Sequence, residues 1–238
     1  MFRKPKRFLR SVLLWFGIAI LVYGLTVSVI YFGLDCGLSV GARTLLSEGK
    51  SLLSNVIASF ILYFLVVYLP AGRKRAILRA SCKKMYLSTK KEILFDILSG
   101  SRKGGRKDIQ ITDGLEDALM EPAAFAKFFR DGREADEGFH AFSNYIQGDE
   151  QAFRSIIFKL KLVARQLEFV LNNVDFDDDE TFQKLKWLEE FLFALDDLHA
   201  DYDNVKSLNR AIWPIFSGWS NVDGYLGFDL IEKAIDEI

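Results

Sequence analysis

The sequence predicts an all-α membrane protein, with an N-terminal two-helix transmembrane hairpin followed by a C-terminal cytosolic helical bundle. Three observations predict this class. Residues 11–34 and 51–70 contain no charged side chain, which is rare in a water-soluble protein. From residue 108 onward, apolar residues recur every three or four positions and no alternating strand pattern occurs. With only two cysteines, a disulfide scaffold or a Cys-rich zinc site is excluded.

The two uncharged stretches are long enough to cross a bilayer. They contain 24 and 20 residues, and at about 1.5 Å per residue each spans a hydrocarbon core of roughly 30 Å. A cleaved signal peptide is the alternative for 11–34, because basic residues precede it at Arg3, Lys4, Lys6, Arg7 and Arg10. The stretch is longer than the roughly 7–15 apolar residues of such a peptide, and no small-residue cleavage site follows. We therefore expect transmembrane spans at about 11–34 and 51–70, within a hairpin of residues 1–72.

The flanking charges predict the orientation. Lys and Arg are abundant before the first span and after Pro70, whereas the segment between the spans contains only Arg43 and Lys50. Short loops rich in Lys and Arg stay on the cytoplasmic side. We expect a multi-pass protein of the bacterial inner membrane, with both termini cytoplasmic and residues 35–50 as an outer loop. Cys36 would then lie outside and Cys82 inside.

Small and polar residues in the spans are candidates for helix contacts or for lining a pore. They recur on one side of each predicted helix and comprise Gly17, Gly24, Ser28, Ser51, Asn55 and Ser59. Small residues let helix backbones approach, and Ser or Asn can hydrogen-bond across the contact. Packing within one hairpin, a polar stripe in a homo-oligomeric pore and simple exposure to lipid are the three interpretations. Neither span contains an ionisable side chain of the kind that proton relays and ion transporters use.

Residues 73–107 form a basic segment with twelve Lys and Arg against two acidic residues. Its apolar residues recur at helical spacing up to Leu98, which predicts a basic amphipathic helix. The candidates for contact with anionic lipid headgroups are Arg73, Lys74, Arg75, Arg79, Lys83 and Lys84. The alternative is that these charges only fix the membrane topology, on a helix that packs against its own domain. Direct contact with nucleic acid is not expected, because aromatic residues are few in this segment. The Gly, Ser and basic residues of 99–107 predict a flexible linker.

Residues 108–238 carry 28 acidic and 12 basic side chains, so this segment is strongly acidic. Apolar stripes predict helices at 153–170 and 182–198, and shorter ones at 115–129, 139–146, 205–213 and 225–238. The carboxylates at 177–180 are suited to cap the start of a helix, and Pro214 with Gly218 to end one. We expect a bundle of four to six helices with a phenylalanine-rich core. Its acidic surface would recruit a protein partner.

No motif predicts an enzyme, a cofactor or a metal ion. The acidic run from Asp175 departs from a calcium-binding loop, because Glu180 replaces the required glycine and Lys186 the final glutamate. Asp196, His199 and Asp203 would share one side of a helix and are the weak alternative for a divalent metal. Exposed carboxylates beside one histidine at a helix end are more often simply solvated. We therefore expect no catalytic, cofactor-binding or metal-binding residue.

The order of parts resembles that of bacterial two-transmembrane effector proteins of anti-phage systems, including those carried with retrons. The resemblance covers a basic N-terminus, a membrane hairpin and a helical cytosolic domain. It implies damage to the inner membrane once a sensing complex is disturbed. The corresponding hypothesis is a membrane effector whose cytosolic domain binds a regulatory partner and controls self-assembly of the hairpin.

Two other functions remain open. In a membrane-tethered adaptor the hairpin is only an anchor, and the acidic domain recruits a soluble partner. In an enzyme, the cluster from Asp196 to Asp203 would bind a metal. Replacement of Asn55 and Ser59 by leucine distinguishes the effector from the adaptor. An anchor tolerates this replacement, whereas an assembling pore does not. Metal-dependent activity that is lost on changing His199 would favour the enzyme.

Overall fold

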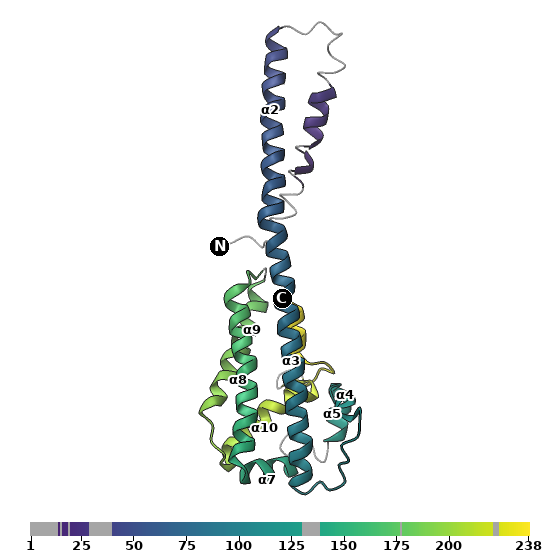
Figure 1. Ribbon diagram of the computed structural model, residues 1–238, viewed down its shortest axis with the longest axis vertical. Coiled ribbons are helices and arrows are strands. Elements are labelled where there is room, and N and C mark those ends of the chain that lie inside the picture. Colours follow the sequence, from purple (N-terminus) through teal and green to yellow (C-terminus); the bar gives the residue numbers. More distant parts are fainter. Residues whose placement is uncertain are drawn as a thin grey trace. The chain divides into compact units, whose positions relative to one another are not determined.

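The protein is mostly helical and forms two compact units in a computed structural model (Figure 1). The structure describes residues 14, 16–18, 20–28, 40–129, 139–176, 178–220 and 224–238. The N-terminal unit comprises Met1–Ala76 and the C-terminal unit Ile77–Ile238. The predicted all-α class is confirmed at this level, since the one sheet in the described part of the chain has two strands of two residues each.

The N-terminal unit is built on a long run of helix. Helix α2 (Val40–Tyr63) passes into the π-helix η2 (Phe64–Tyr68), which passes into α3 (Leu69–Lys103). The predicted outer loop of 35–50 is thus helical from Val40 onward, and residues 35–39 lie outside the described residues. The uncharged run of 51–70 sits within this continuous helix. The glycine and serine residues in the first part of α2 do not end the helix, because neither residue type excludes the helical conformation.

The first predicted span is only partly described. Residues 20–28 are helical, as are Leu14 and residues 16–18, and the apolar helix Phe16–Ser28 is shorter than a bilayer requires. The remainder of 11–34 lies outside the described residues. The two-helix hairpin is therefore not confirmed, and the one described helix long enough to cross a membrane is the run that contains 51–70.

The C-terminal unit packs the second part of α3 with a set of shorter helices. Its further elements are α4 (Leu115–Leu119), α5 (Pro122–Phe128), α7 (His140–Gly148), α8 (Glu150–Asn173), α9 (Asp179–Ala194), η3 (Leu195–Asp197), α10 (Tyr202–Ser217), β1 (Trp219–Ser220), β2 (Gly224–Tyr225) and α11 (Leu230–Asp236). Strands β1 and β2 pair antiparallel, with Trp219 opposite Tyr225. The described helices exceed the four to six expected, because 115–129 contains two helices and the stripe of 182–198 is divided between α9 and η3. The expected helix of 225–238 is α11, preceded by part of β2.

Aspartates start four of these helices. The side chains of Asp149, Asp178, Asp201 and Asp229 accept hydrogen bonds from the first free backbone N–H groups of α8, α9, α10 and α11. The predicted cap within 177–180 is thus Asp178. Helix α10 runs through Pro214 and ends at Gly218, whose φ of 66° is left-handed, so the expected stop at Pro214 is wrong.

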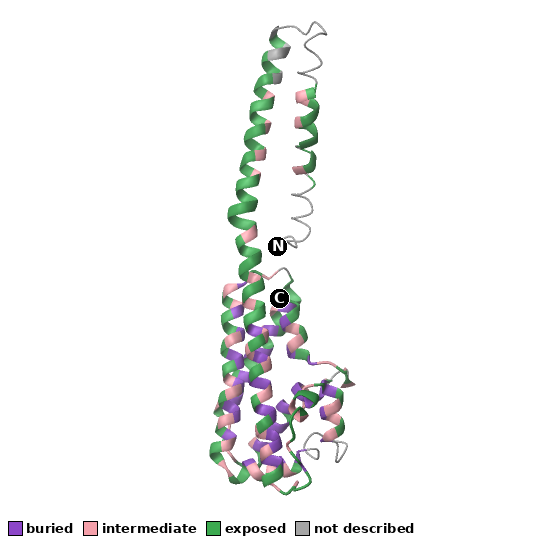
Figure 2. Cartoon of the chain, turned by 45° about the vertical axis from the view of Figure 1, so that its right-hand side comes forward, coloured by how far each residue is buried: buried purple, intermediate pink, exposed green. Residues whose placement is uncertain are grey.

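The core is apolar and rich in phenylalanine. Helices α8 and α9 run side by side (Figure 1), and eight side chains of α8 are buried on one face. The ring of Phe125 lies within 6.0 Å of the rings of Phe129, Phe139, Trp213 and Phe216, centroid to centroid. Phenylalanines therefore form much of the core, as expected, although Phe158, Phe169 and Phe193 are exposed. Figure 2 shows buried residues through the C-terminal unit, whereas the described residues of the N-terminal unit are exposed or half-buried.

The predicted linker at 99–107 is wrong for its first half. Helix α3 continues through Ser99 to Lys103, and Gly100 and Ser101 are buried. A Cβ added at Gly100 would lie 2.8 Å from the Tyr145 ring, and one at Gly104 would lie 1.8 Å from the carbonyl oxygen of Ala141. These glycines let α7 approach the end of α3, which is a packing role rather than a flexible one. The compact unit accordingly begins at Ile77 and not at 108.

Candidate membrane-interacting site

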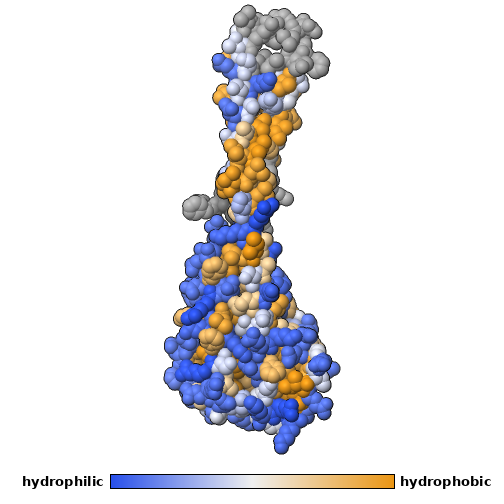
Figure 3. Space-filling view, viewed as in Figure 1, coloured by the Kyte–Doolittle hydropathy of each residue, from blue (hydrophilic) through white to orange (hydrophobic). Residues whose placement is uncertain are grey.

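An apolar helical window in the run Ser47–Lys103 is the main candidate for a functional site. Its mean hydropathy over 18 residues is 2.2, and none of the window is buried. At about 1.5 Å per residue, 18 residues span about 27 Å, close to the thickness of a bilayer core. A core helix of a soluble protein with this composition would be covered by protein. Figure 3 shows the corresponding apolar surface as a continuous orange band.

Among the described residues of the N-terminal unit, the first apolar segment contacts one side of α2. The rings of Phe16 and Phe60 stack with centroids 4.4 Å apart. Leu53 and Ile57 share a side of α2 with Phe60 and are half-buried like it, and Tyr23 is half-buried on the first segment. Bulky side chains therefore mediate this contact, rather than the small residues that the sequence pattern suggested.

The six candidate helix-contact residues point elsewhere. Gly17, Gly24 and Ser28 are exposed, and no heavy atom lies within 4 Å of a Cβ built on either glycine. Ser51, Asn55 and Ser59 are exposed as well, on the side of α2 opposite Leu53, Ile57 and Phe60. The structure does not bring the two sets together. Within the described residues, the Asn55 side chain makes no hydrogen bond.

The six basic headgroup candidates divide into two groups on α3. Arg73, Lys74, Arg79 and Lys84 are exposed and Arg75 is half-buried. Lys83 instead binds helix α11, because its Nζ lies 2.7 Å from Asp236 and 3.0 Å from Glu232. The hydrogen bond to Asp236, followed by that to Glu232, raises the pKa of Lys83. Lys83 is therefore a contact within the C-terminal unit rather than a free cation for lipid.

A buried ion pair anchors α11 to α3. The Nζ of Lys90 lies 2.5 Å from Oδ2 of Asp229, and the two side chains are 2% and 3% exposed. Tyr86 donates its hydroxyl hydrogen to the same oxygen at 2.6 Å. The other carboxylate oxygen accepts from the backbone N–H groups of Ile231 and Glu232. Each side-chain polar atom of this network thus has a hydrogen-bond partner inside the protein, and the two charges are paired, which is the condition for a charge to be tolerated there.

Two other groups on this stretch of α3 have perturbed acidity. Burial raises the pKa of the Cys82 thiol to about 11. Burial also raises the pKa of Tyr86 well above its ordinary value, and the negative charge of Asp229 adds to the effect. Both groups keep their protons at neutral pH. Cys82 is therefore an unreactive core residue and not a nucleophile.

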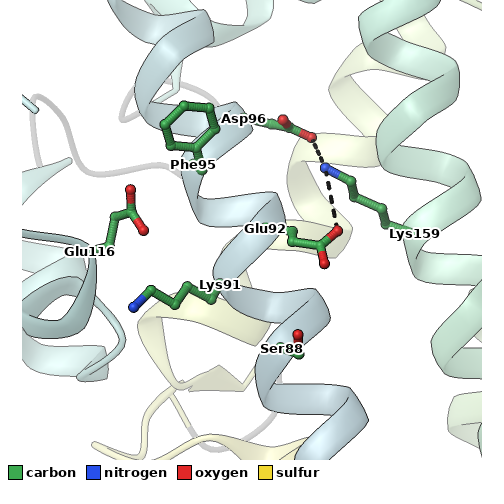
Figure 4. Close-up of a pocket in the computed structure, with 7 residues that line it drawn as sticks. All are labelled: Ser88, Lys91, Glu92, Phe95, Asp96, Glu116 and Lys159. Carbon is green, nitrogen blue, oxygen red and sulfur yellow. Dashed lines mark hydrogen bonds and ion pairs between the residues drawn. The ribbon is translucent and has the colours of Figure 1, made fainter.

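A groove of about 360 Å³ lies between α3, α4 and α8 (Figure 4). Lys159 of α8 reaches Asp96 of α3 at 2.6 Å and Glu92 at 4.0 Å, as the dashed lines show. Lys91 pairs with Asp117 at 2.5 Å. These ion pairs join α3 to α8 and to α4, and they engage both lysines of the groove. The arrangement is typical of packing between elements rather than of a ligand site.

The alternative metal cluster is not assembled. Asp196 lies in η3 and pairs with Lys161, His199 follows η3 with Nδ1 3.0 Å from the carbonyl oxygen of Asp197, and Asp203 lies in α10. The three residues do not share one helix, because the chain is extended at Leu198 between η3 and α10. Among the described residues, no group of three His, Cys, Asp or Glu side chains is placed to hold a metal ion.

Sequence reasoning missed the Lys90–Asp229 pair. The two residues are 139 positions apart, and Lys90 looked like one of many basic residues of α3. The only available signal was Asp229 before a short apolar helix, which predicts a helix cap but not a buried ion pair.

Comparisons with known proteins add no relative. No family model matches the chain, and no significant match is found among curated proteins or among solved structures. The class defined by the fold is thus a mostly helical protein in which one of the described helices is long and apolar enough to cross a membrane.

Proposed function

We propose that this chain is a bacterial inner-membrane effector, in which self-association of the apolar N-terminal unit perturbs the membrane under the control of the C-terminal unit. The carrying observation is the apolar window, of which no residue is buried in the described part of the chain. An exposed apolar surface of this length is stable only in lipid or against another apolar surface. The flanking Lys and Arg favour cytoplasmic termini and a multi-pass arrangement.

Self-association is supported by the exposed polar stripe of Ser51, Asn55 and Ser59. Asn55 has no hydrogen-bond partner among the described residues, and in lipid such a group favours contacts that satisfy it. Interhelical hydrogen bonds of this kind contribute about 1–2 kcal/mol, and less in some proteins. Because that is too little to hold an oligomer alone, we assign the control of assembly to the C-terminal unit. A role in anti-phage defence follows only from the resemblance in the order of parts.

A membrane-tethered adaptor is the competing function, since it needs the same anchor but no toxicity. Induced expression of the full chain, followed by dye uptake and membrane potential, separates the two. We expect depolarisation by the full chain and its loss in the variant Asn55→Leu with Ser59→Leu. Ser54→Leu, at an exposed position of the same helix about 100° away from Asn55, is the matched control and should keep the toxicity. An intact membrane in every case, including after removal of a cognate partner, would establish the adaptor.

Orientation needs a new labelling site, because Cys82 is 1% exposed and would resist reagents on either side of the membrane. The variant Lys184→Cys, in a background with Cys36→Ser and Cys82→Ala, places the only thiol of the chain on an exposed part of α9. We expect an impermeant maleimide to label it only in permeabilised cells. Labelling in intact cells would show that the C-terminal unit lies outside.

A further inference from the structure

Helix α8 carries apolar side chains on two opposite faces. One face is the buried one of the core. On the other, Phe158, Leu162 and Phe169 are 59%, 38% and 50% exposed. Together with Arg165 they recur at spacings of four, three and four residues, and we call these four residues the outer stripe. This is the d-a-d-a spacing of a coiled-coil seam, and it extends over about 16 Å of helix. A helix that is apolar on both faces needs a second covering surface.

The outer stripe lies in the most basic part of the acidic segment. Residues 154–165 contain four of the twelve basic side chains of 108–238 and no acidic one. Lys159 and Lys161 are neutralised by Asp96 and Asp196. Arg165 has no carboxylate partner within the part of the chain that the structure describes. The stripe thus offers three apolar side chains around one uncompensated guanidinium.

This charge selects among the surfaces that could cover the stripe. A parallel pair of α8 helices from two copies would place Arg165 against Arg165. An antiparallel pair would place Arg165 against Leu162, where the guanidinium would be buried without a partner. A partner helix with apolar residues at heptad spacing and a carboxylate in the Arg165 layer satisfies both requirements.

We infer that the outer stripe of α8 docks an acidic amphipathic helix of a second protein. The inference rests on the proposed function, because it names the surface through which the C-terminal unit is held in check. The partner helix covers Phe158, Leu162 and Phe169, and its carboxylate forms a bidentate pair with Arg165. Large apolar side chains and arginine at the centre of an interface carry most of the binding energy in such contacts.

The test uses the full chain in lipid nanodiscs and a designed peptide with leucine at successive a and d positions and one glutamate in the Arg165 layer. Fluorescence anisotropy of the labelled peptide gives the affinity. We expect saturable binding, and at least about a tenfold loss in the variant Leu162→Glu with Phe169→Glu. Trp187→Glu is the matched control, because Trp187 is an exposed apolar residue of α9 outside the stripe, and it should leave binding unchanged.

A charge exchange tests the arginine pair directly. Arg165→Glu should weaken binding of the peptide that has glutamate in the Arg165 layer. The same variant should bind a peptide that has lysine at that position. Absence of binding to the unaltered chain would overturn the inference, as would equal binding by the stripe variants. Dimerisation of the full chain that is lost with Leu162→Glu would also overturn it, in favour of a second copy as occupant. Membrane potential plays no part in this measurement, so its outcome is independent of whether the chain is toxic.

Discussion

Asp229 makes the densest set of polar contacts around any one side chain described here. Its carboxylate accepts from Lys90, Tyr86 and two backbone N–H groups of α11. Removal of one partner from a buried ion pair leaves an uncompensated charge, which costs far more than the net contribution of the intact pair. The pair therefore specifies where α11 sits on α3 more than it adds stability.

We expect Asp229→Ala to lower the free energy of unfolding of residues 77–238 by about 3–5 kcal/mol, because Lys90 is left unpaired and α11 loses its cap. Urea unfolding followed by circular dichroism measures this. Asp236→Ala is the control, since its pair with Lys83 is half exposed, and we expect a loss below about 1 kcal/mol. Equal losses in the two variants would contradict the buried-pair account.

We expect the free energy of unfolding to fall at alkaline pH. The pKa of Cys82 is raised to about 11 from 9.0, and that of Tyr86 is raised above its ordinary value. The folded state therefore holds protons that the unfolded chain releases. The associated stability is fully present below about pH 9 and is lost as pH rises through the folded-state values.

A series of urea unfolding curves between about pH 8 and about pH 11 checks this, and Cys82 alone should account for a loss on the order of 2 kcal/mol. The variant Cys82→Ala with Tyr86→Phe should flatten the dependence. A free energy of unfolding that rises over this range would refute the assignment.

At the scale of the elements, sequence patterning predicted α8 and α9 well, because each has a long apolar stripe and an aspartate cap. It failed at the end of α3, where Gly, Ser and basic residues suggested a linker. Composition reports local preference, whereas Gly100 and Gly104 are required by the approach of α7, which only the tertiary structure reveals. The same limit applies to Lys83 and Lys90, whose carboxylate partners are far away in the sequence.

Gly104→Ala tests that close approach. The added Cβ would lie 1.8 Å from a backbone oxygen of Ala141, so α3 and α7 must separate. We expect a loss of about 2 kcal/mol or more in the free energy of unfolding, by analogy with overpacked cores. Gly148→Ala, with open space around its Cβ, is the control and should change stability little. An unchanged free energy of unfolding in Gly104→Ala would favour a flexible linker at 99–107.

The second part of α3 is an integral part of the C-terminal unit. Ile93, Leu94, Ile97 and Leu98 are each at most 2% exposed. We expect a fragment of residues 77–238 to be helical and to unfold cooperatively, whereas 108–238 should lack a cooperative transition because its core is incomplete. Thermal melting of both fragments by circular dichroism measures this. Cooperative unfolding of the 108–238 fragment would show that the C-terminal unit begins after the basic segment 73–107.

At the scale of the whole molecule, the chain is polarised in charge and in hydropathy. Basic residues concentrate in 73–107 and acidic residues beyond, while the longest apolar window precedes both. These features could be predicted from the sequence because they depend on composition alone. The two-helix hairpin depends on a structural observation instead, and the structure describes only part of 11–34.

Membrane association through the window is directly testable. Leu62→Arg with Val66→Arg places two charges among exposed apolar side chains, at roughly 2.5–3.5 kcal/mol each on the insertion scale. We expect the full chain to resist extraction from membranes by alkaline carbonate and the double variant to be extracted. Trp187→Arg on α9 is the control and should stay with the membrane. Retention of the double variant would argue against the window as the anchor.

The Lys90–Asp229 pair also has a consequence for how the protein is made. Its two residues are 139 positions apart, and nine residues follow Asp229 in the sequence. At about 5–20 residues per second, a ribosome needs on the order of ten seconds between them. During that interval the apolar window is already synthesised, while Lys90 and the apolar face of α3 still lack α11. The apolar window is therefore complete before the C-terminal unit can close.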